Sequence, residues 1–508
     1  MHQPNNHPMR PRPNIALVLA AAAATVLAAC STSTVKLKGR PQGAIALPLK
    51  GVYTATVRAP FIGPVSGRLT AEPVEGGFVA NSRPDVAWQM IGGFQGLLGQ
   101  IFTPFLFPGG VIITWTSGLP EDGKPAEGVI GIGGIRSISV KTRMSTADGV
   151  VELVGPDNRR VATLSLTPSA ADAPPLANYP ELARRIDSAV QSRLYDRSLV
   201  DSAGVRGYLA QLKSASAISR DDVEFIFGAV VAARNNVKFS IPIAIPRPDD
   251  AARRLAAEDS ANPELATVRA TFDKRSGFAV LKAEAFLEPE DVDRAFAKIL
   301  EWKPKGLIVD IRSCPGVTLA SLRVASWLID KPTDAGAFFG PDRREDALAG
   351  KTDAFPRVEI NSAAAVREAE SVLDAQGAAS IVIMPESATF TGPVAVLISR
   401  RTTTSAEPLA WLLKATGRAR LFGTATVGRP VISRPIDIGQ GWDFWLAACD
   451  FRPAFGDRIN DRGVKPDVDA GRESSRLAAY RWLRAQTKPA EPTPPPPPEA
   501  PAPAEPEA

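Results

Sequence analysis

The side chains that could do chemistry in this chain are hydroxyls, carboxylates and basic groups, because histidine is almost absent. The two histidines, His2 and His7, both precede the first long apolar run. Their position removes histidine-based metal sites and a Ser-His-Asp triad from the folded part of the chain. Hydroxyl side chains at residues 402–405 lie between an apolar segment and a helix-like segment, and Glu407 follows them. Such hydroxyls are nucleophiles only where a second group takes their proton.

A reactive thiol, Cys30, ends an apolar segment near the N-terminus. Two arginines precede the apolar run of residues 15–29, which is short for a membrane span. Small residues directly before a cysteine resemble the lipobox of bacterial lipoprotein signals, in which the thiol is acylated and residues 1–29 are removed. We predict lipidation at Cys30 and a membrane anchor; the alternative is an ordinary signal peptide with a chance cysteine. Ser31 resembles the outer-membrane sorting pattern, which predicts an outer-membrane lipoprotein of the cell envelope that faces the periplasm.

Two further cysteines, Cys314 and Cys449, lie in the body of the chain. The periplasm is oxidising, so one possibility is a disulfide between them. The other possibility is a pair of small buried thiols, because sequence separation does not establish spatial proximity.

The composition indicates a folded protein of several domains. The 508 residues are 44% hydrophobic, which is enough for roughly two to four domains. The 59 basic and 54 acidic residues give a net charge of +5. No concentrated basic stripe is visible, so we expect no nucleic acid as a partner.

The elements before residue 270 divide into a β-rich and a helical part. After a linker at residues 30–43, short strand signals with turn residues between them predict a β-rich domain over 44–168, either a barrel or a sandwich. Residues 178–240 are predicted to form a helical region, in which Ser219 is a candidate N-cap for a second helix. Four apolar residues at four-residue spacing predict one buried helix face: Leu182, Ile186, Val190 and Leu194.

Strands and helices then alternate from about residue 270 to 472. This alternation predicts an α/β domain with a mostly parallel sheet and crossover helices. Residues 331–390 are interpreted as an irregular insertion with its own helix near 363–375. The Pro-rich tail, residues 487–508, is predicted to be disordered or extended. The expected strands include 278–281, 306–311 and 394–398, and the expected helices are 289–300, 318–329 and 405–416.

Five sequence blocks in this domain resemble the catalytic domain of the C-terminal processing peptidases, also called tail-specific proteases. The resemblance implies a crotonase-like α/β fold and serine-type peptidase activity on proteins or peptides, without a metal ion or cofactor. No clear PDZ module, which those peptidases insert before the catalytic domain, is recognised here. The blocks are GFAVL at 277–281, GLIVDIRSCPG at 306–316, VLI to TSAE at 396–407, GRARLFG to TVGR at 417–429 and GVKPD at 463–467.

The resemblance also assigns roles to individual residues. In the family a serine attacks the peptide carbonyl, a lysine 25 residues later is the general base, and a glutamate lies three residues after the serine. Alignment on Glu407 places Thr404 at the nucleophile position and Arg429 at the base position. Arginine keeps its proton in proteins, so Arg429 cannot accept one from a hydroxyl. The oxyanion loop corresponds to Gly316 and Val317, where a Cβ replaces the family's second glycine and restricts the backbone.

Ser405 is an alternative nucleophile if the turn is shifted by one residue, and it would need a base from elsewhere. Lys414 lies nine residues further along the same helix, about 13 Å away, which is too far. Lys282 and Lys465 stay open as bases. A purely structural role is equally open, in which Ser405 caps the following helix.

Two functions therefore compete. The first is a membrane-anchored serine-type peptidase of the envelope. The second is a catalytically inactive pseudopeptidase that acts as a peptide-binding or scaffold protein. In the second, Arg429 either binds the carboxylate of a free C-terminus or binds Glu407 and holds the old site closed. The expected partner is a protein or a peptide in both cases.

Overall fold

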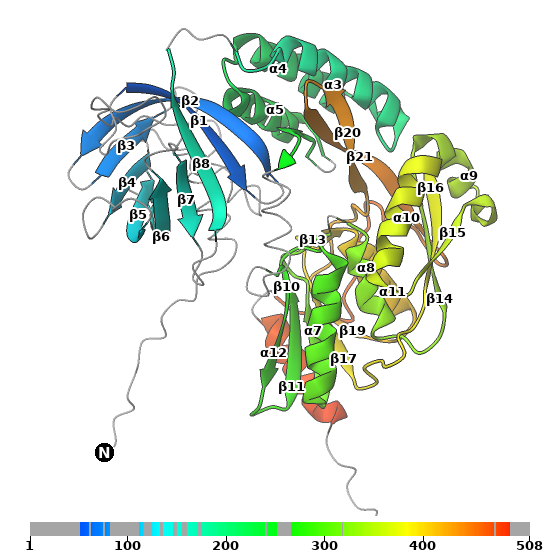
Figure 1. Cartoon of the computed structure of the whole chain (residues 1–508). Coiled ribbons are helices and arrows are strands. Elements are labelled where there is room, and N and C mark those ends of the chain that lie inside the picture. The colour runs from blue at the N-terminus through cyan, green and yellow to red at the C-terminus, as the bar shows by residue number, and fades with distance from the viewer. Residues whose placement is uncertain are drawn as a thin grey trace, which may run out of the picture.

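The computed structural model describes residues 51–59, 62–74, 77–81, 111–115, 124–132, 136–145, 150–154, 160–170, 175–238, 241–250, 266–316, 318–471 and 474–487. These residues form a β-barrel, a group of three helices and an α/β domain (Figure 1). The predictions for Cys30, Val317 and the Pro-rich tail lie outside the described residues. None of the described helices combines the length and hydropathy of a membrane span.

The β-rich part is a closed antiparallel barrel rather than a sandwich. Each strand pairs with the next, and the first pairs with the last, so no sheet edge is left at the closure. Tyr53, Val65 and Leu166 are buried. The strands are β1 (Gly51–Ala59), β2 (Ile62–Val74), β3 (Gly77–Asn81), β4 (Val111–Trp115), β5 (Pro125–Ile132), β6 (Arg136–Ser145), β7 (Val150–Val154) and β8 (Arg160–Pro168).

Three helices follow the barrel: α3 (Tyr179–Arg193), α4 (Ala203–Ile218) and α5 (Asp222–Asn236), with a short 3-10 helix η3 (Arg197–Leu199) after α3. The predicted apolar face of α3 is buried at all four positions.

The prediction that Ser219 is an N-cap is wrong. Ser219 instead ends α4, where its hydroxyl donates to the carbonyl of Ala215 at 2.8 Å. The N-cap of α5 is Asp221, whose carboxylate accepts the N–H of Glu224 at 2.9 Å.

The N-terminus of α5 also contacts the barrel. Asp221 accepts the backbone N–H of Arg68 on β2 at 3.0 Å. The neighbouring Asp222 accepts the hydroxyl of Tyr179 at 2.9 Å and hydrogen-bonds with the backbone of Ser66. Burial raises the pKa of Asp222 to about 7. The hydrogen bond from Tyr179 acts to lower this pKa, and the charge of Asp221 raises it further. A single pair of aspartates thus joins the helices to β2.

The Asp222→Asn variant is expected to lose part of the pH dependence of stability. An unfolded aspartate ionises near pH 4, whereas the pKa of folded Asp222 is about 7. Between these values the unfolded chain loses this proton and the folded protein keeps it, so stability falls as the pH rises. Urea midpoints at pH 5 and pH 8 should differ less in Asp222→Asn than in the wild type. Asp187→Asn, on the exposed side of α3, should keep the wild-type difference, and an equal difference in all three would contradict the assignment.

The main sheet of the α/β domain is parallel except at one edge, which confirms the predicted mostly parallel sheet. Its order is β10-β11-β12-β17-β19-β22, and only β10 runs antiparallel to its neighbour. The strands are β10 (Val268–Asp273), β11 (Phe278–Ala283), β12 (Gly306–Asp310), β17 (Val394–Ile398), β19 (Arg420–Gly423) and β22 (Val468–Asp469).

Helices cover both faces of this sheet because both faces are apolar. Alternate strand residues such as Leu307 and Val309 join the main core, which includes α7 (Pro289–Trp302), α8 (Ala320–Ser326) and α11 (Ala406–Ala415). The residues between them, such as Ile308, pack against α12 (Ser474–Gln486) on the other face.

Residues 331–390 are not an irregular insertion, which corrects the prediction. They supply three strands of a second sheet, β14 (Thr333–Phe339), β15 (Arg357–Ile360) and β16 (Ala378–Ile383), and the helix α10 (Ala363–Gln376). The strand order is β15-β16-β14-β21-β20, and β9 also pairs with β21. The other elements are β9 (Ile243–Pro246), β20 (Ile432–Gly439), β21 (Trp442–Pro453), α9 (Arg344–Leu348), η4 (Pro341–Arg343) and η5 (Thr352–Ala354).

Both body cysteines are free and buried, so of the two possibilities the structure has the pair of small buried thiols. Burial raises the pKa of Cys449 to about 12 and also raises the pKa of the Cys314 thiol. Neither thiol is therefore a nucleophile at neutral pH.

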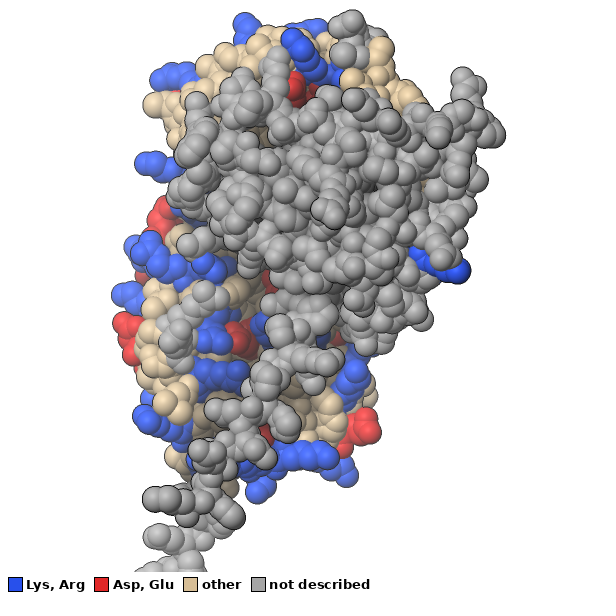
Figure 2. Space-filling model, turned by 90° about the vertical axis from the view of Figure 1, so that its left-hand side faces the viewer, with Lys and Arg blue, Asp and Glu red and all other residues tan. Residues whose placement is uncertain are grey.

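Charge is mixed on the described surface. Figure 2 shows Lys and Arg interspersed with Asp and Glu over the part of the molecule that is not drawn in grey. Many of these charges are paired, for example Arg462 with Asp457 and Arg197 with Asp342.

Candidate functional site

The candidate site is a tight turn between two short strands and a helix. The strands β13 (Pro315–Gly316) and β18 (Thr403–Thr404) pair in parallel, and α11 begins two residues after Thr404. We call residues 403–406 the elbow. Thr404 has a φ of +52°, in the left-handed region that β-branched residues avoid.

The hydroxyl of Thr404 is unpaired among the described residues. Its Oγ1 is buried and makes no hydrogen bond within the described residues. Its backbone N–H, in contrast, donates to the carbonyl of Arg429 at 3.0 Å. The main chain of Thr404 is therefore fixed, while its side chain offers a donor and an acceptor that are unused.

The Thr404→Gly variant is expected to be more stable than the wild type by about 1 kcal/mol. Glycine removes the left-handed penalty of about 1–2 kcal/mol and a buried, unpaired hydroxyl, and it loses some chain entropy in return. Urea denaturation measures the difference. Thr403→Gly is the matched control, since Thr403 does not have a positive φ and should only be destabilised. A clear loss of stability in Thr404→Gly would show that the elbow is not strained.

Ser405 lies beside Thr404 but its hydroxyl is committed elsewhere. The side chain is fully buried, and its Oγ donates to the carbonyl of Thr318 at 2.5 Å. Its carbonyl accepts the hydroxyl of Ser321 at 2.9 Å. Ser405 occupies the N-cap position of α11, yet its side chain makes no capping hydrogen bond. The predicted cap role is wrong in this respect, because the hydroxyl of Ser405 is hydrogen-bonded to the Thr318 carbonyl and not to the helix backbone.

Glu407 is buried and bonds to the backbone of the loop that carries Arg429. Its two oxygens accept the N–H of Gly428 at 2.7 Å and the N–H of Arg429 at 2.6 Å. Burial raises the pKa of Glu407 to about 7, although hydrogen bonds from Thr426 and these two N–H groups act to lower it.

The side chain of Arg429 is exposed, and it forms no ion pair within the described residues. Of the two alternatives for Arg429, the salt bridge to Glu407 is not formed; the carboxylate accepts the backbone N–H groups of Gly428 and Arg429 instead. The cationic group of Arg429 remains available on the surface beside the elbow, and its charge still contributes to lowering the pKa of Glu407.

A second loop, which contains Asp461 and Val464, is hydrogen-bonded to residues 424–429. Thr426 exchanges two hydrogen bonds with Val464, through its N–H at 3.1 Å and its Oγ1 at 2.7 Å. The N–H of Asp461 donates to the carbonyl of Gly428 at 2.8 Å. A Cβ on Gly463 would lie 2.2 Å from the Thr426 carbonyl. Thr426 was not identified from the sequence as a residue of the site. The glycines at 428 and 463 were the available signal, because they allow the two loops to approach closely.

Among the described residues, no hydrogen bond joins the elbow to Lys414, Lys282 or Lys465, the three lysines considered above. Lys414 binds the carbonyl of Lys465 at 2.8 Å and Asp467 at 2.9 Å. Lys282 binds Glu284 at 2.8 Å. Lys465 is exposed. Among the described residues no group of His, Cys, Asp or Glu could hold a metal ion.

Gly316 packs directly against the elbow. Its carbonyl accepts the N–H of Ser405 at 3.4 Å, and a Cβ at this position would lie 2.2 Å from Ser405 Oγ. The other expected oxyanion residue, Val317, is outside the described residues.

Residues 277–470 match peptidase family S41, and no curated protein matches the chain. A lipoprotein from Streptococcus agalactiae aligns with a TM-score of 0.39 and 13% identity over 62% of this chain and 99% of its own. For the photosystem II D1 C-terminal processing protease the TM-score is 0.34, with 14% identity over 62% and 98%. Mature CPAF gives 0.30 and 19% identity over 43% and 53%.

Proposed function

Residues 277–470 belong to peptidase family S41, and on this premise we propose that the protein is a non-catalytic member that binds polypeptide chains at the elbow. The assigned nucleophile and base positions are Thr404 and Arg429. The binding function keeps the family's protein or peptide partner and gives up the cleavage step. We further propose that Cys30 carries a lipid anchor in the outer membrane.

The observation that carries the proposal is the partnerless hydroxyl of Thr404. A hydroxyl nucleophile must pass its proton to a base within about 3 Å. Thr404 Oγ1 is buried and has no hydrogen-bond partner within the described residues. Glu407 is the nearest acidic candidate in sequence, but both of its oxygens accept backbone N–H groups. Arg429 keeps its proton and cannot serve.

Arg429 is suited to binding instead. Its side chain is exposed, while its backbone is held by Thr404 at the carbonyl and by Glu407 at the N–H. A guanidinium on a fixed backbone can bind a carboxylate by donating two parallel hydrogen bonds. A free polypeptide C-terminus presents such a carboxylate.

A second candidate function is an active peptidase in which Thr404 is the nucleophile. The observation that favours it is the φ of +52°, because a β-branched residue in the left-handed region is costly and such strain concentrates at active sites. This function requires a base from the residues around the elbow.

Binding of peptides with a free or an amidated C-terminus tests the proposed function. We expect the wild type to bind the free form about tenfold more tightly, which corresponds to one charge-assisted contact. Arg429→Gln should remove this preference, since it removes the cation and keeps the fixed backbone. Arg420→Gln, an equally exposed arginine on β19, should keep it. Equal binding of both peptides by the wild type would contradict the role of Arg429.

Cleavage assays separate the two functions. We expect no cleavage of unfolded casein by the wild type, and some cleavage by the Thr404→Ser, Arg429→Lys double variant. Wild-type cleavage that disappears in Thr404→Ala would establish the peptidase instead. The anchor is tested by Cys30→Ala, which should release the protein from the membrane fraction.

A further inference from the structure

A cavity of about 450 Å³ lies next to the elbow, and most of its lining residues are not part of the candidate site. It lies between the start of α7, one side of α10 and β20. Glu288 and Pro289 come from the α7 end, Arg367 and Glu370 from α10, and Arg434 from β20.

Thr318 links this cavity to the elbow. Thr318 lines the cavity, and its carbonyl accepts the hydroxyl of Ser405 at 2.5 Å. Its own hydroxyl donates to the carbonyl of Phe286 at 3.0 Å, so Thr318 is held from both sides. The cavity and Ser405 of the elbow therefore contact the same residue, Thr318.

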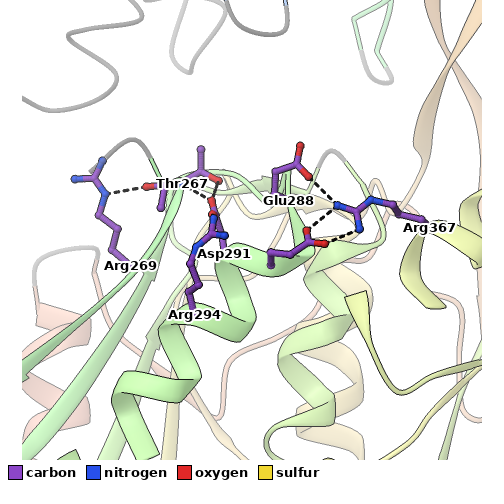
Figure 3. Close-up of polar contacts among 8 residues, drawn as sticks. Thr267, Arg269, Glu288, Asp291, Arg294 and Arg367 are labelled. Carbon is purple, nitrogen blue, oxygen red and sulfur yellow. Dashed lines mark hydrogen bonds and ion pairs between the residues drawn. The ribbon is translucent and has the colours of Figure 1, made fainter. Parts of the chain in front are cut away.

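The two arginines of the cavity are already neutralised. Arg434 binds both oxygens of Asp374. Arg367 binds both oxygens of Glu290, at 2.6 and 2.7 Å. Figure 3 shows Arg367 reaching toward the α7 end, where it also contacts Glu288. Each guanidinium already donates to both oxygens of one carboxylate, so within the described residues the cavity has no unpaired cation for an anionic ligand.

Two carboxylates of the cavity each have one oxygen without a hydrogen-bond partner among the described residues. Glu370 accepts the N–H of Leu319 with Oε1 at 2.8 Å, and the same oxygen is 3.9 Å from Arg434. Glu288 accepts from Arg367 with Oε2 at 3.2 Å. Burial raises the pKa of Glu288, which a cation in the cavity would oppose. Four carboxylates, Glu288 and Glu370 together with the partners of the arginines, face two guanidinium groups, and the excess charge is negative.

The remaining walls are apolar, at Leu287, Pro289 and Val366. Lys and Arg side chains have this same division, because an aliphatic stem carries the charged head. We propose that the cavity binds the Lys or Arg side chain of a polypeptide held at the elbow, with Glu288 and Glu370 as the acceptors. This inference rests on the proposed function and adds a substrate class to it.

The test compares peptides that differ only by arginine or citrulline, a neutral side chain of the same shape, in binding to the full chain. All peptides have an amidated C-terminus, so the preference is independent of Arg429. We expect the arginine peptide to bind about tenfold more tightly. Glu370→Gln and Glu288→Gln should each reduce this preference to about twofold. Glu370→Gln keeps an oxygen for the Leu319 N–H, and Glu368→Gln, exposed on the same helix, is the matched control and should keep the full preference.

Three results would overturn the inference. Equal binding of the arginine and citrulline peptides would show that the cavity does not distinguish a charged side chain from a neutral one. A preference that survives in both Gln variants would place the contact elsewhere. Binding of the small cation agmatine, reduced by the Gln variants, without any peptide binding would assign the cavity to a free amine. If the arginine preference holds while free and amidated peptides bind equally, only the role of Arg429 fails.

Discussion

The Asp450→Ala variant is expected to lose about 3–5 kcal/mol of stability, because it removes a carboxylate that two partly buried guanidinium groups share. Asp450, on β21, is fully buried. It accepts from Arg344 at 2.7 Å, from Arg458 at 2.6 Å and from Asn460 at 2.8 Å. Removal of this carboxylate therefore takes an acceptor from all three side chains and from the backbone N–H of Phe451, which donates to it at 2.8 Å.

The effect of Asp450 should extend to the candidate site. Arg344 also binds Asp196 at 2.6 Å, which ties the helical region to α9. Arg458 and Asn460 begin the loop that continues to Asp461, whose N–H holds Gly428. Hydrogen exchange of residues 424–429 should consequently become faster in the variant.

Urea denaturation measures the loss at Asp450, with Asp342→Ala as the control. Asp342 pairs with Arg197 on the surface, and such exposed pairs contribute about 0–1 kcal/mol. Asp450→Asn should fall between the two, since its amide oxygen still accepts one hydrogen bond. If Asp450→Ala and Asp342→Ala cost the same, the buried cluster does not stabilise the fold.

The Gly316→Ala variant is the second large effect, with an expected loss of about 3 kcal/mol. A Cβ at this position would lie 2.2 Å from Ser405 Oγ and 2.3 Å from the backbone nitrogen of Ala406. The second contact is with the main chain at the start of α11, so a rotamer change of Ser405 cannot relieve it. The elbow itself must move.

Thermal and urea denaturation of Gly316→Ala and of the Gly316→Ala, Ser405→Ala double variant test this contact. The double variant removes the hydroxyl but not the contact with Ala406, so it should recover only a part of the loss. Gly417→Ala is the control: its φ is +68°, but no atom lies within 4 Å of the added Cβ, and about 1 kcal/mol is expected. Equal losses at 316 and 417 would show that the strands around the elbow yield easily.

The regular parts of the fold could be predicted because their signals are local. The four-residue spacing in α3 requires only neighbouring turns of one helix, and the apolar run Gly306–Asp310 requires only one strand. Ser219 shows the limit of such signals. Both Ser219 and Asp221 are good N-cap residues, and the choice depended on the carboxylate also reaching the N–H of Arg68 in the barrel.

The second sheet was missed because its strands have weak patterns. Thr333–Phe339 contains Asp, Gly and two Ala, and it becomes a strand through pairing with β16 on one side and β21 on the other. Arg357–Ile360 is only four residues long. Tertiary context determined these strands, as strand propensity depends on neighbours.

The spacing of residues in the sequence predicted which residues of the candidate site lie together, but not which atoms of them form hydrogen bonds. Thr404, Glu407 and Arg429 do meet in space. One of the two alternatives for Arg429 was a bond from its guanidinium to Glu407, whereas the observed bond comes from its backbone N–H. The cavity between α7, α10 and β20 could not be predicted, because it depends on how three distant segments pack.

The bonding of position 429 has a consequence for how the site changes over time. Glu407 and Thr404 hold an N–H and a carbonyl there, and neither bond involves the side chain. Every amino acid except proline supplies both groups. Substitution at this position therefore exchanges the chemistry that faces the elbow and leaves the loop in place, so a single mutational step is enough to give the same scaffold a different ligand preference.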